Sequence, residues 1–135
     1  FPQGAPGETA SRLLGPDRLR SPGRHERSRR DENHNVLAWT EVGRTDGLNG
    51  MLDGLSGAPV LDEAGQVVGL TLAEAPRRGR IYTTSPQAIR KALADAAAKP
   101  SSFARGEPVN VENYGRVGDS LRRDLRVAKV VCLAN

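Results

Sequence analysis

Short apolar runs separated by turns dominate the chain, and this pattern predicts β-strands rather than long helices. Five strands are expected from it, over Gly7–Leu14, Val36–Val42, Ala58–Leu61, Gln66–Leu72 and Arg80–Thr84. The four residues Asp62-Glu63-Ala64-Gly65 between the third and fourth runs are turn formers, so these two runs are predicted to form a β-hairpin.

One helix is predicted after the last of these strands. Ser85 is a good N-cap, and Pro86 takes the first helical position, where the missing N–H is no loss. Ile89, Leu93 and Ala96 then recur on one face, and Lys99-Pro100 ends the helix.

Three further segments break this pattern. Gly15 to Asn35 is rich in Arg, Glu, Asp and Pro, which predicts an exposed loop. Ser101 to Asn113 is polar and is expected to be a linker. In the tail that follows, Ser120 to Arg126 could form a basic helical turn or two, and Val127 to Leu133 is expected to be a strand.

Composition narrows the class of protein without naming a function. The 135 residues are 37% hydrophobic and 27% charged, which suits one globular domain, and no apolar run is long enough for a membrane segment. The net charge of +4 raises the question of nucleic-acid binding, through Arg18 to Arg30 and Arg122-Arg123. Because no aromatic residue is interleaved in the first of these stretches, we favour a solvated loop and expect no nucleic-acid partner.

The chain offers no pattern for a metal or cofactor. Cys132 is the single cysteine, and His25 and His34 are the only histidines, far from it in sequence. The chain also begins without Met and without an apolar signal segment. We therefore expect a piece of a longer protein, with Cys132 a buried or free thiol and no cofactor.

The stretch Gly54-Leu55-Ser56-Gly57-Ala58-Pro59 is the motif that carries chemistry. In the nucleophile elbow of α/β-hydrolases, Gly stands two positions after Ser and a helix follows. Here position 58 is Ala, and Pro59 opens a hairpin, so the elbow is rejected. In the alternative, the backbone N–H groups of the first Gly and of the Ser point at one spot and stabilise the oxyanion of a tetrahedral intermediate. In that interpretation Ser56 is the nucleophile, and its backbone N–H and that of Gly54 both donate to the oxyanion.

The order of motifs from Phe1 to about Ala98 resembles the C-terminal barrel of trypsin-like serine proteases, most closely the bacterial Deg/HtrA type. Phe1-Pro2-Gln3-Gly4 is similar to the start of that barrel, and Gly54 to Val60 to its nucleophile loop. Asp62 to Thr71 is similar to the family's D-x-x-G-x-V-x-G hairpin, and Arg80 to Leu93 to its final strand and helix. Ala58 stands where the family usually has a second Gly.

The resemblance implies a fold and an arrangement of domains. The fold is all-β: a six-stranded antiparallel Greek-key barrel, the C-terminal half of the chymotrypsin fold, with one closing helix and a C-terminal extension. Residues 1–98 would form the barrel, with 15–35 an exposed Arg-rich loop, and residues 99–135 the linker and extension. Periplasmic or secreted localisation follows from the resemblance alone.

The resemblance also implies a function, serine endopeptidase activity through an acyl-enzyme on Ser56. In the family the base His and the orienting Asp lie on a preceding barrel, and His34 precedes Ser56 by only 22 residues. Neither His34 nor His25 fits that role, so this chain alone is expected to be inactive. Its partners would be the N-terminal protease barrel and a peptide substrate bound along Gly50, Met51, Leu52, Leu70, Thr71 and Leu72. With no Asp at Gly50, small or medium apolar side chains are the expected substrates.

Two other interpretations stay open. Ser56 could be an ordinary turn serine beside a hairpin, or the barrel could be catalytically inactive and bind peptides or proteins. A basic nucleic-acid-binding domain is the third class, and it predicts affinity that falls steeply with salt.

Overall fold

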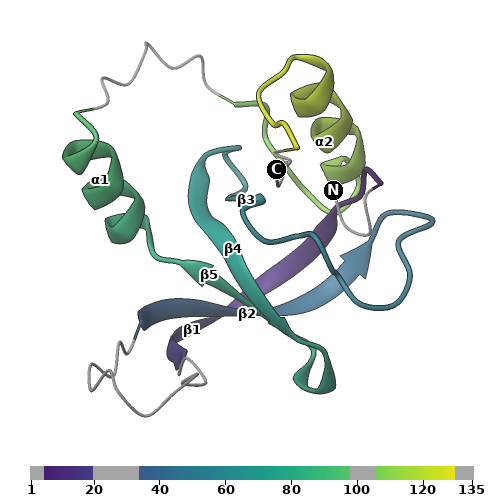
Figure 1. The fold of residues 1–135 in the computed structure, drawn as a ribbon. Helices are drawn as coiled ribbons and strands as arrows, with labels where there is room; N and C mark the ends of the chain where they lie inside the picture. The colour runs from purple at the N-terminus through teal and green to yellow at the C-terminus, as the bar shows by residue number, and fades with distance from the viewer. Residues whose placement is uncertain (1–4, 20–33, 98–105, 130–135) are drawn as a thin grey trace, which may run out of the picture.

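The computed structural model describes residues 5–19, 34–97 and 106–129, which form an antiparallel sheet and two short helices (Figure 1). The strands are β1 (Thr9–Leu19), β2 (His34–Arg44), β3 (Pro59–Leu61), β4 (Val67–Ala75) and β5 (Arg80–Thr84). A short 3₁₀ turn, η2 (Pro76–Arg78), joins β4 to β5. The helices are α1 (Pro86–Asp95) and α2 (Tyr114–Arg123), and they lie on either side of β4 in the view of Figure 1.

The strands are hydrogen-bonded in the order β1-β2-β5-β4-β3, and every pair is antiparallel. Residues 45–58 carry the chain from β2 to β3, at the far edge of the sheet. β1 and β3 are therefore edge strands, each paired on one side only. The expected all-β class is confirmed in its coarse form. The described residues form an open five-stranded sheet, in which no strand joins β1 to β3, so the expected closed six-stranded barrel stays a prediction.

The first two strands extend further than the sequence pattern predicted. β1 continues through Gly15 and Pro16 to Leu19, and β2 begins at His34, so both ends of the expected 15–35 loop belong to strands. The register of β1 shifts twice, and Gly15 takes a φ of +135° at the second shift. A bulge accommodates Gly and an edge strand accommodates Pro, which explains why Gly15 and Pro16 do not end β1. Residues 20–33 lie outside the described residues.

The predicted hairpin and helix are both confirmed. The Asp62 carboxylate accepts hydrogen bonds from the N–H groups of Ala64 (3.0 Å) and Gln66 (2.8 Å), which closes the turn between β3 and β4. Ser85 caps α1 by accepting from the Ala88 N–H at 3.2 Å, and Pro86 is the first helical residue. The capping chemistry acts over neighbouring residues, so the sequence alone suffices to predict it.

The core lies where the long connection crosses the sheet. Leu48, Leu52 and Leu55 from this connection pack on Ile81 of β5, with Trp39 of β2 and Ala58 at the margin. A second cluster joins Val36, Ala38 and Tyr82 across the β2–β5 pair. Three leucines of the 45–58 connection are therefore buried, and their packing holds the connection against the sheet.

The tail differs from the expected linker and strand. α2 begins at Tyr114, before the predicted start at Ser120, and Val127–Lys129 is not a strand. The rest of the expected strand Val127–Leu133 lies outside the described residues. Neither α1 nor α2 has the length and apolar character that a bilayer-spanning helix needs.

Candidate functional site

Two consecutive β-turns shape the segment around Ser56. The Leu55 N–H donates to the Leu52 carbonyl at 3.0 Å, and the Ala58 N–H donates to the Leu55 carbonyl at 2.9 Å. The third residue of each turn is a glycine with positive φ, +89° at Gly54 and +83° at Gly57. Because L-residues with side chains rarely adopt this conformation, the two glycines are what allow both turns to form.

The turns present Ser56 at the surface. Its side chain is exposed, and its hydroxyl donates to the Leu72 carbonyl at a long 3.4 Å. Within the described part of the chain, the backbone N–H groups of Gly54 and Ser56 have no hydrogen-bond partner. A hydroxyl beside two available N–H donors is the minimum that acyl transfer requires of a nucleophile and oxyanion hole.

Backbone hydrogen bonds to β4 and two buried leucines anchor the same segment. The Gly57 N–H donates to the Thr71 carbonyl at 2.8 Å, and the Thr71 N–H returns a bond to the Ala58 carbonyl at 2.9 Å. Leu52 is 3% exposed and Leu55 is 9% exposed, both inside the core. The segment thus buries Leu52 and Leu55, one at the start of each turn, and leaves Ser56 outside.

The residues predicted to bind substrate divide into two groups. Met51, Leu70 and Leu72 are exposed, at 53%, 38% and 40%. Leu52 and Thr71 are buried, with Leu52 in the core cluster and Thr71 lining an internal cavity. Gly50 is exposed in the connection, with a φ of +73°. Of the six predicted residues, those with exposed side chains on β4 are therefore Leu70 and Leu72.

Three charged residues that the sequence reasoning missed hold the 45–58 connection. The Arg44 guanidinium forms a two-point ion pair with Glu41 and donates to the Gly50 carbonyl at 2.5 Å. The Glu74 carboxylate accepts from the Leu52 N–H at 2.8 Å. The hydrogen bond to Glu41 raises the pKa of Arg44, with the charge of Glu74 adding to it. Nothing in the local sequence pairs Glu74 with Leu52, since the two are brought together by the sheet.

No base for Ser56 is found among the described side chains. His34 begins β2, but its side chain is not described, and His25 lies outside the described residues. The described residues also hold no cluster of three or more His, Cys, Asp or Glu suited to a metal ion. Among the described side chains, the arrangement around Ser56 therefore has an exposed hydroxyl and two unpartnered backbone N–H groups without an imidazole.

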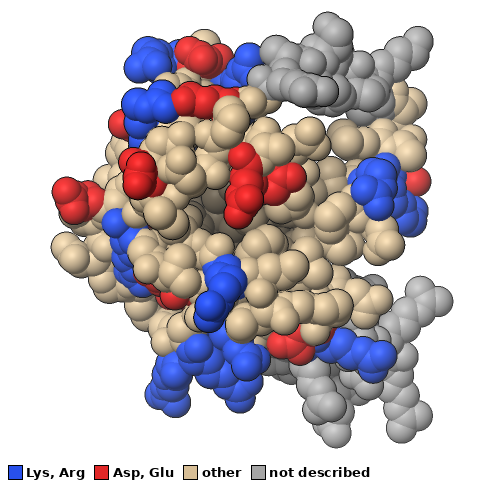
Figure 2. Space-filling view, turned by 180° about the vertical axis from the view of Figure 1, so that it is seen from behind, with Lys and Arg blue, Asp and Glu red and all other residues tan. Residues whose placement is uncertain are grey.

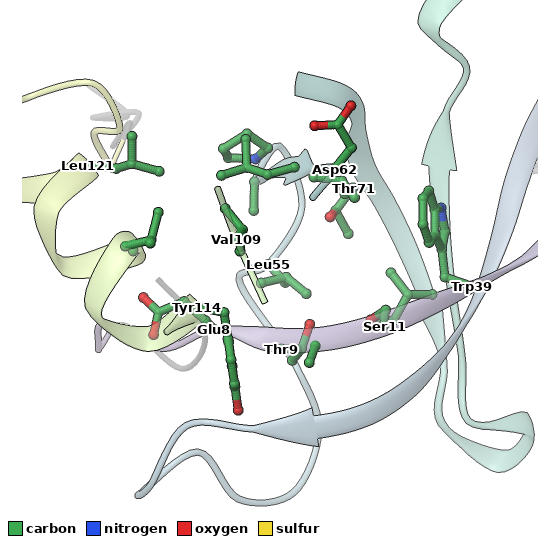
Figure 3. Close-up of a pocket in the computed structure, with 18 of the residues that line it drawn as sticks. Glu8, Thr9, Ser11, Trp39, Leu55, Asp62, Thr71, Val109, Tyr114 and Leu121 are labelled. Atoms are coloured by element: carbon green, nitrogen blue, oxygen red, sulfur yellow. The ribbon is translucent and has the colours of Figure 1, made fainter. Parts of the chain in front are cut away.

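A cavity of about 310 Å³ opens beside the site, between the two edge strands (Figure 3). Thr9 and Ser11 of β1 line one wall, and β3 lines another. Trp39, Leu55 and Thr71 line it from the sheet and the core, and Val109 and Leu121 from the tail. Ser56 is not among its lining residues, so the cavity and the exposed hydroxyl are separate features.

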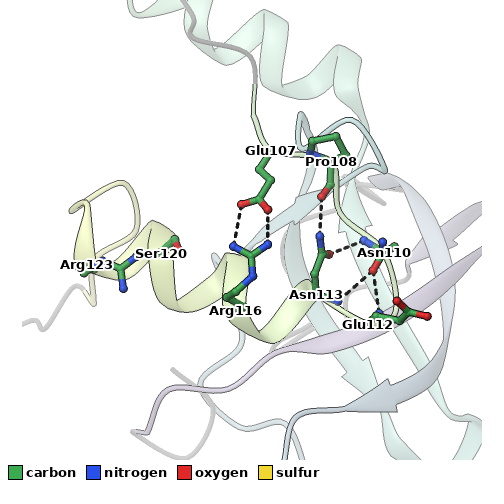
Figure 4. Close-up of polar contacts among 8 residues, drawn as sticks. All are labelled: Glu107, Pro108, Asn110, Glu112, Asn113, Arg116, Ser120 and Arg123. Carbon is green, nitrogen blue, oxygen red and sulfur yellow. Dashed lines mark hydrogen bonds and ion pairs between the residues drawn. The ribbon is translucent and has the colours of Figure 1, made fainter.

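Backbone contacts and ion pairs hold the tail against this cavity. The Val109 N–H donates to the Glu63 carbonyl at 2.9 Å, just beyond β3. Asn110 and Asn113 close the turn before α2 through side-chain hydrogen bonds, and Glu107 forms an ion pair with Arg116 (Figure 4). The Arg116 hydrogen bond lowers the pKa of Glu107. The tail is thus packed onto the sheet rather than extending away from it.

The chain was compared with known protein families, curated proteins and solved structures. Neither the protein-family models, nor the curated proteins, nor the solved structures contain a significant match to the chain.

Proposed function

We propose that this chain supplies the nucleophile and oxyanion hole of a trypsin-like serine endopeptidase of the Deg/HtrA type. The observation that carries the proposal is the double turn at Leu52–Ala58, which exposes Ser56 and leaves the Gly54 and Ser56 N–H groups without partners in the described residues. An ordinary turn serine needs neither the two positive-φ glycines that flank Ser56 nor the two buried leucines, Leu52 and Leu55, that precede it.

The strand order supports the finer fold that the proposal requires. β3, β4 and β5 follow one another through short connections, and β2 lies beside β5. This is the order of a Greek key traced from its last strand to its first. In the proposed barrel, a sixth strand between β1 and β3 completes the circle.

The chemistry follows from the groups at the site and from those that the N-terminal barrel would bring. The Ser56 oxygen attacks the scissile carbonyl carbon while its proton passes to the partner's imidazole, which an Asp orients. The Gly54 and Ser56 N–H groups hold the resulting oxyanion. The C–N bond then breaks as the imidazolium protonates the leaving amine, and water hydrolyses the acyl-enzyme by the reverse proton path.

An exposed apolar surface next to Ser56 supports binding of a substrate and of that second barrel. Leu70 and Leu72 stand on β4, and α1 contacts the same strand and exposes Leu93 at 48%. Leu72 also accepts the Ser56 hydrogen bond, so this surface begins at the nucleophile. A peptide lying along it would meet apolar side chains, which fits small or medium apolar specificity.

Specific observations also favour a second candidate, an inactive barrel that binds peptides without cleaving them. No described side chain can accept the Ser56 proton in the way an imidazole does, and the hydroxyl donates to a backbone carbonyl instead. A nucleic-acid interface is less well supported, because acidic and basic side chains are interspersed on the face in Figure 2.

Hydrolysis of a quenched fluorescent casein distinguishes the active endopeptidase from the inactive barrel. The assay uses the proposed protease with both barrels present. Ser56→Ala is expected to lower kcat by about 10³-fold or more, because the acyl-enzyme cannot form. Ser120→Ala, on the remote helix α2, is the matched control and is expected to leave the rate unchanged. Equal rates for Ser56→Ala and the unmodified enzyme would exclude Ser56 as nucleophile. Casein binding without any hydrolysis would favour the inactive barrel.

A further inference from the structure

Residues 109–127 cover the cavity between β1 and β3 without filling it. Val109, Val117 and Leu121 line the cavity from this side, and about 310 Å³ remains open among the described residues. Protein interiors are close-packed, and voids larger than a water molecule are few in a domain. A volume of this size falls at the lower end of the range of small-molecule pockets, about 300–1,000 Å³. The space that remains therefore has the size of a small-molecule site.

The walls of the cavity are mainly apolar. Leu55 and Ile81 belong to the core, and Trp39 packs against them. The Trp39 indole N–H donates to the Thr83 hydroxyl at 2.9 Å, and that hydroxyl donates to the Thr84 carbonyl at 3.1 Å. Because both of these polar groups are already paired, the indole contributes ring surface to the cavity rather than a hydrogen-bond donor.

Thr71 supplies a polar group that the walls leave unpaired. It lines the cavity and is only 5% exposed (Figure 3). Its backbone N–H and carbonyl bond to Ala58 and Gly57, but no described residue pairs with its hydroxyl. The half-buried residues Thr9 and Ser11 add two hydroxyls on the β1 wall. Since buried hydroxyls nearly always have a partner, a ligand with one hydrogen-bonding group would complete the Thr71 site.

The charged residues of the lining disfavour an anion. Among the described lining residues the cation is Arg122, and it is paired with Glu8 and Asp119. Asp62 and Glu63 lie at the β3 end of the cavity, and both are carboxylates. An anionic ligand would be desolvated beside these carboxylates with no unpaired cation to receive it, so an uncharged ligand fits best.

We propose that this cavity binds one uncharged two-ring molecule, whose single hydrogen-bonding group pairs with the Thr71 hydroxyl and whose rings pack on Trp39. An apolar cavity of about 150 Å³ holds one benzene ring, so about twice that volume suits two fused rings. The inference does not depend on the proposed function, because Ser56 is not among the lining residues.

The test titrates indole into the 135-residue chain and follows Trp39, the single tryptophan, by NMR. The Trp39 indole N–H resonance is expected to shift and to saturate below about 1 mM indole. Indene keeps the two-ring shape but replaces the N–H with CH₂, and it is expected to bind about fivefold more weakly because the Thr71 hydroxyl stays unpaired. Indole-2-carboxylate, an anion at pH 7, is expected to bind at least about tenfold more weakly than indole.

Thr71→Val is the matched variant, because it removes the hydroxyl and keeps the shape of the side chain. It is expected to weaken indole binding about fivefold and to leave indene binding unchanged, which also shows that the cavity is intact. Ser56→Ala is expected to bind indole as the unmodified chain does, so loss of protease activity would leave this site standing.

Three results would overturn the proposal. The first is a Trp39 resonance that does not respond to indole. The second is equal affinity for indole and indene, or an equal loss of both in Thr71→Val, which would show that the hydroxyl does not contact the ligand. The third is tighter binding of the carboxylate than of indole.

Discussion

The segment around Ser56 and the tail that ends at α2 both lie against the same sheet, but different contacts hold them. The Leu52–Ala58 segment is shaped by two turns with their own glycines and is held down by buried leucines. The tail is held by the Glu8–Arg122 ion pair, by the Val109–Glu63 backbone hydrogen bond and by close approaches at glycines. Val117 is the buried side chain of α2. Local turns with core packing hold the first segment, whereas the second is held by long-range contacts and its attachment depends on a few residues.

The largest expected effect comes from removing the leucine beneath the first turn. Leu52→Ala is expected to lower the free energy of unfolding by about 2–5 kcal/mol, because a 3% exposed side chain leaves a cavity in the core. Urea denaturation measures this change. Leu72→Ala, 40% exposed on β4, is the control, and a loss there as large as that of Leu52→Ala would show that the core does not lie under the turn.

Alanine substitutions at two glycines test the contact between the tail and the β3–β4 turn. Gly65 and Gly79 both have positive φ, +72° and +56°, so alanine at either is expected to cost about 1–2 kcal/mol of strain. A Cβ on Gly65 would also collide with the Glu107 carbonyl, whereas Gly79 has open space around it. Gly65→Ala is therefore expected to destabilise the fold by about 1–3 kcal/mol more than Gly79→Ala in the same denaturation experiment. Equal losses would mean that residues 106–107 do not pack there.

The ion pair between Glu8 and Arg122 is expected to hold α2 at the start of β1. Both side chains are nearly buried, at 18% and 19% exposure, and Gly118 leaves room for the carboxylate. Arg122→Gln is expected to cost about 1–3 kcal/mol and to speed proteolysis within α2, because Glu8 loses a charged partner. Arg123→Gln, whose guanidinium is exposed, is the control, and matching proteolysis rates for the two variants would refute this role.

The smallest effect concerns pH and the exposed pair of Glu107 and Arg116. Because Arg116 lowers the pKa of Glu107 in the folded chain, the pair stabilises the fold at pH values above the ordinary carboxyl pKa of 4.5. The contribution is lost as pH falls through the lowered value of the folded state. Unfolding curves of the unmodified chain and of Glu107→Gln are therefore expected to differ slightly at pH 7 and to converge in acid. A difference that grows in acid would contradict the pair.

Sequence reasoning located the hairpin, the Ser85 cap and the outline of the strands, because each depends on residues a few positions apart. It misjudged β1, where a bulge carries the strand through Gly15 and Pro16. It also missed the part of α2 before Ser120, because Gly115 and Gly118 are poor helix formers. In the fold, a Cβ at these positions would collide with Thr45 and Glu8, which explains the glycines. At the candidate site it proposed Ser56 and Gly54, which stay a prediction. The anchoring of the loop by Arg44 and Glu74 depends on strand neighbours that the order of residues does not reveal.

The central proposal, that Ser56 is a nucleophile served by the N–H groups of Gly54 and Ser56, is tested most directly by a fluorophosphonate probe on the proposed protease with both barrels present. Mass spectrometry of the digested product is expected to find one adduct, on Ser56, absent in Ser56→Ala and retained in Ser120→Ala. Folded protease that acquires no adduct, or acquires it on another residue, would contradict the account.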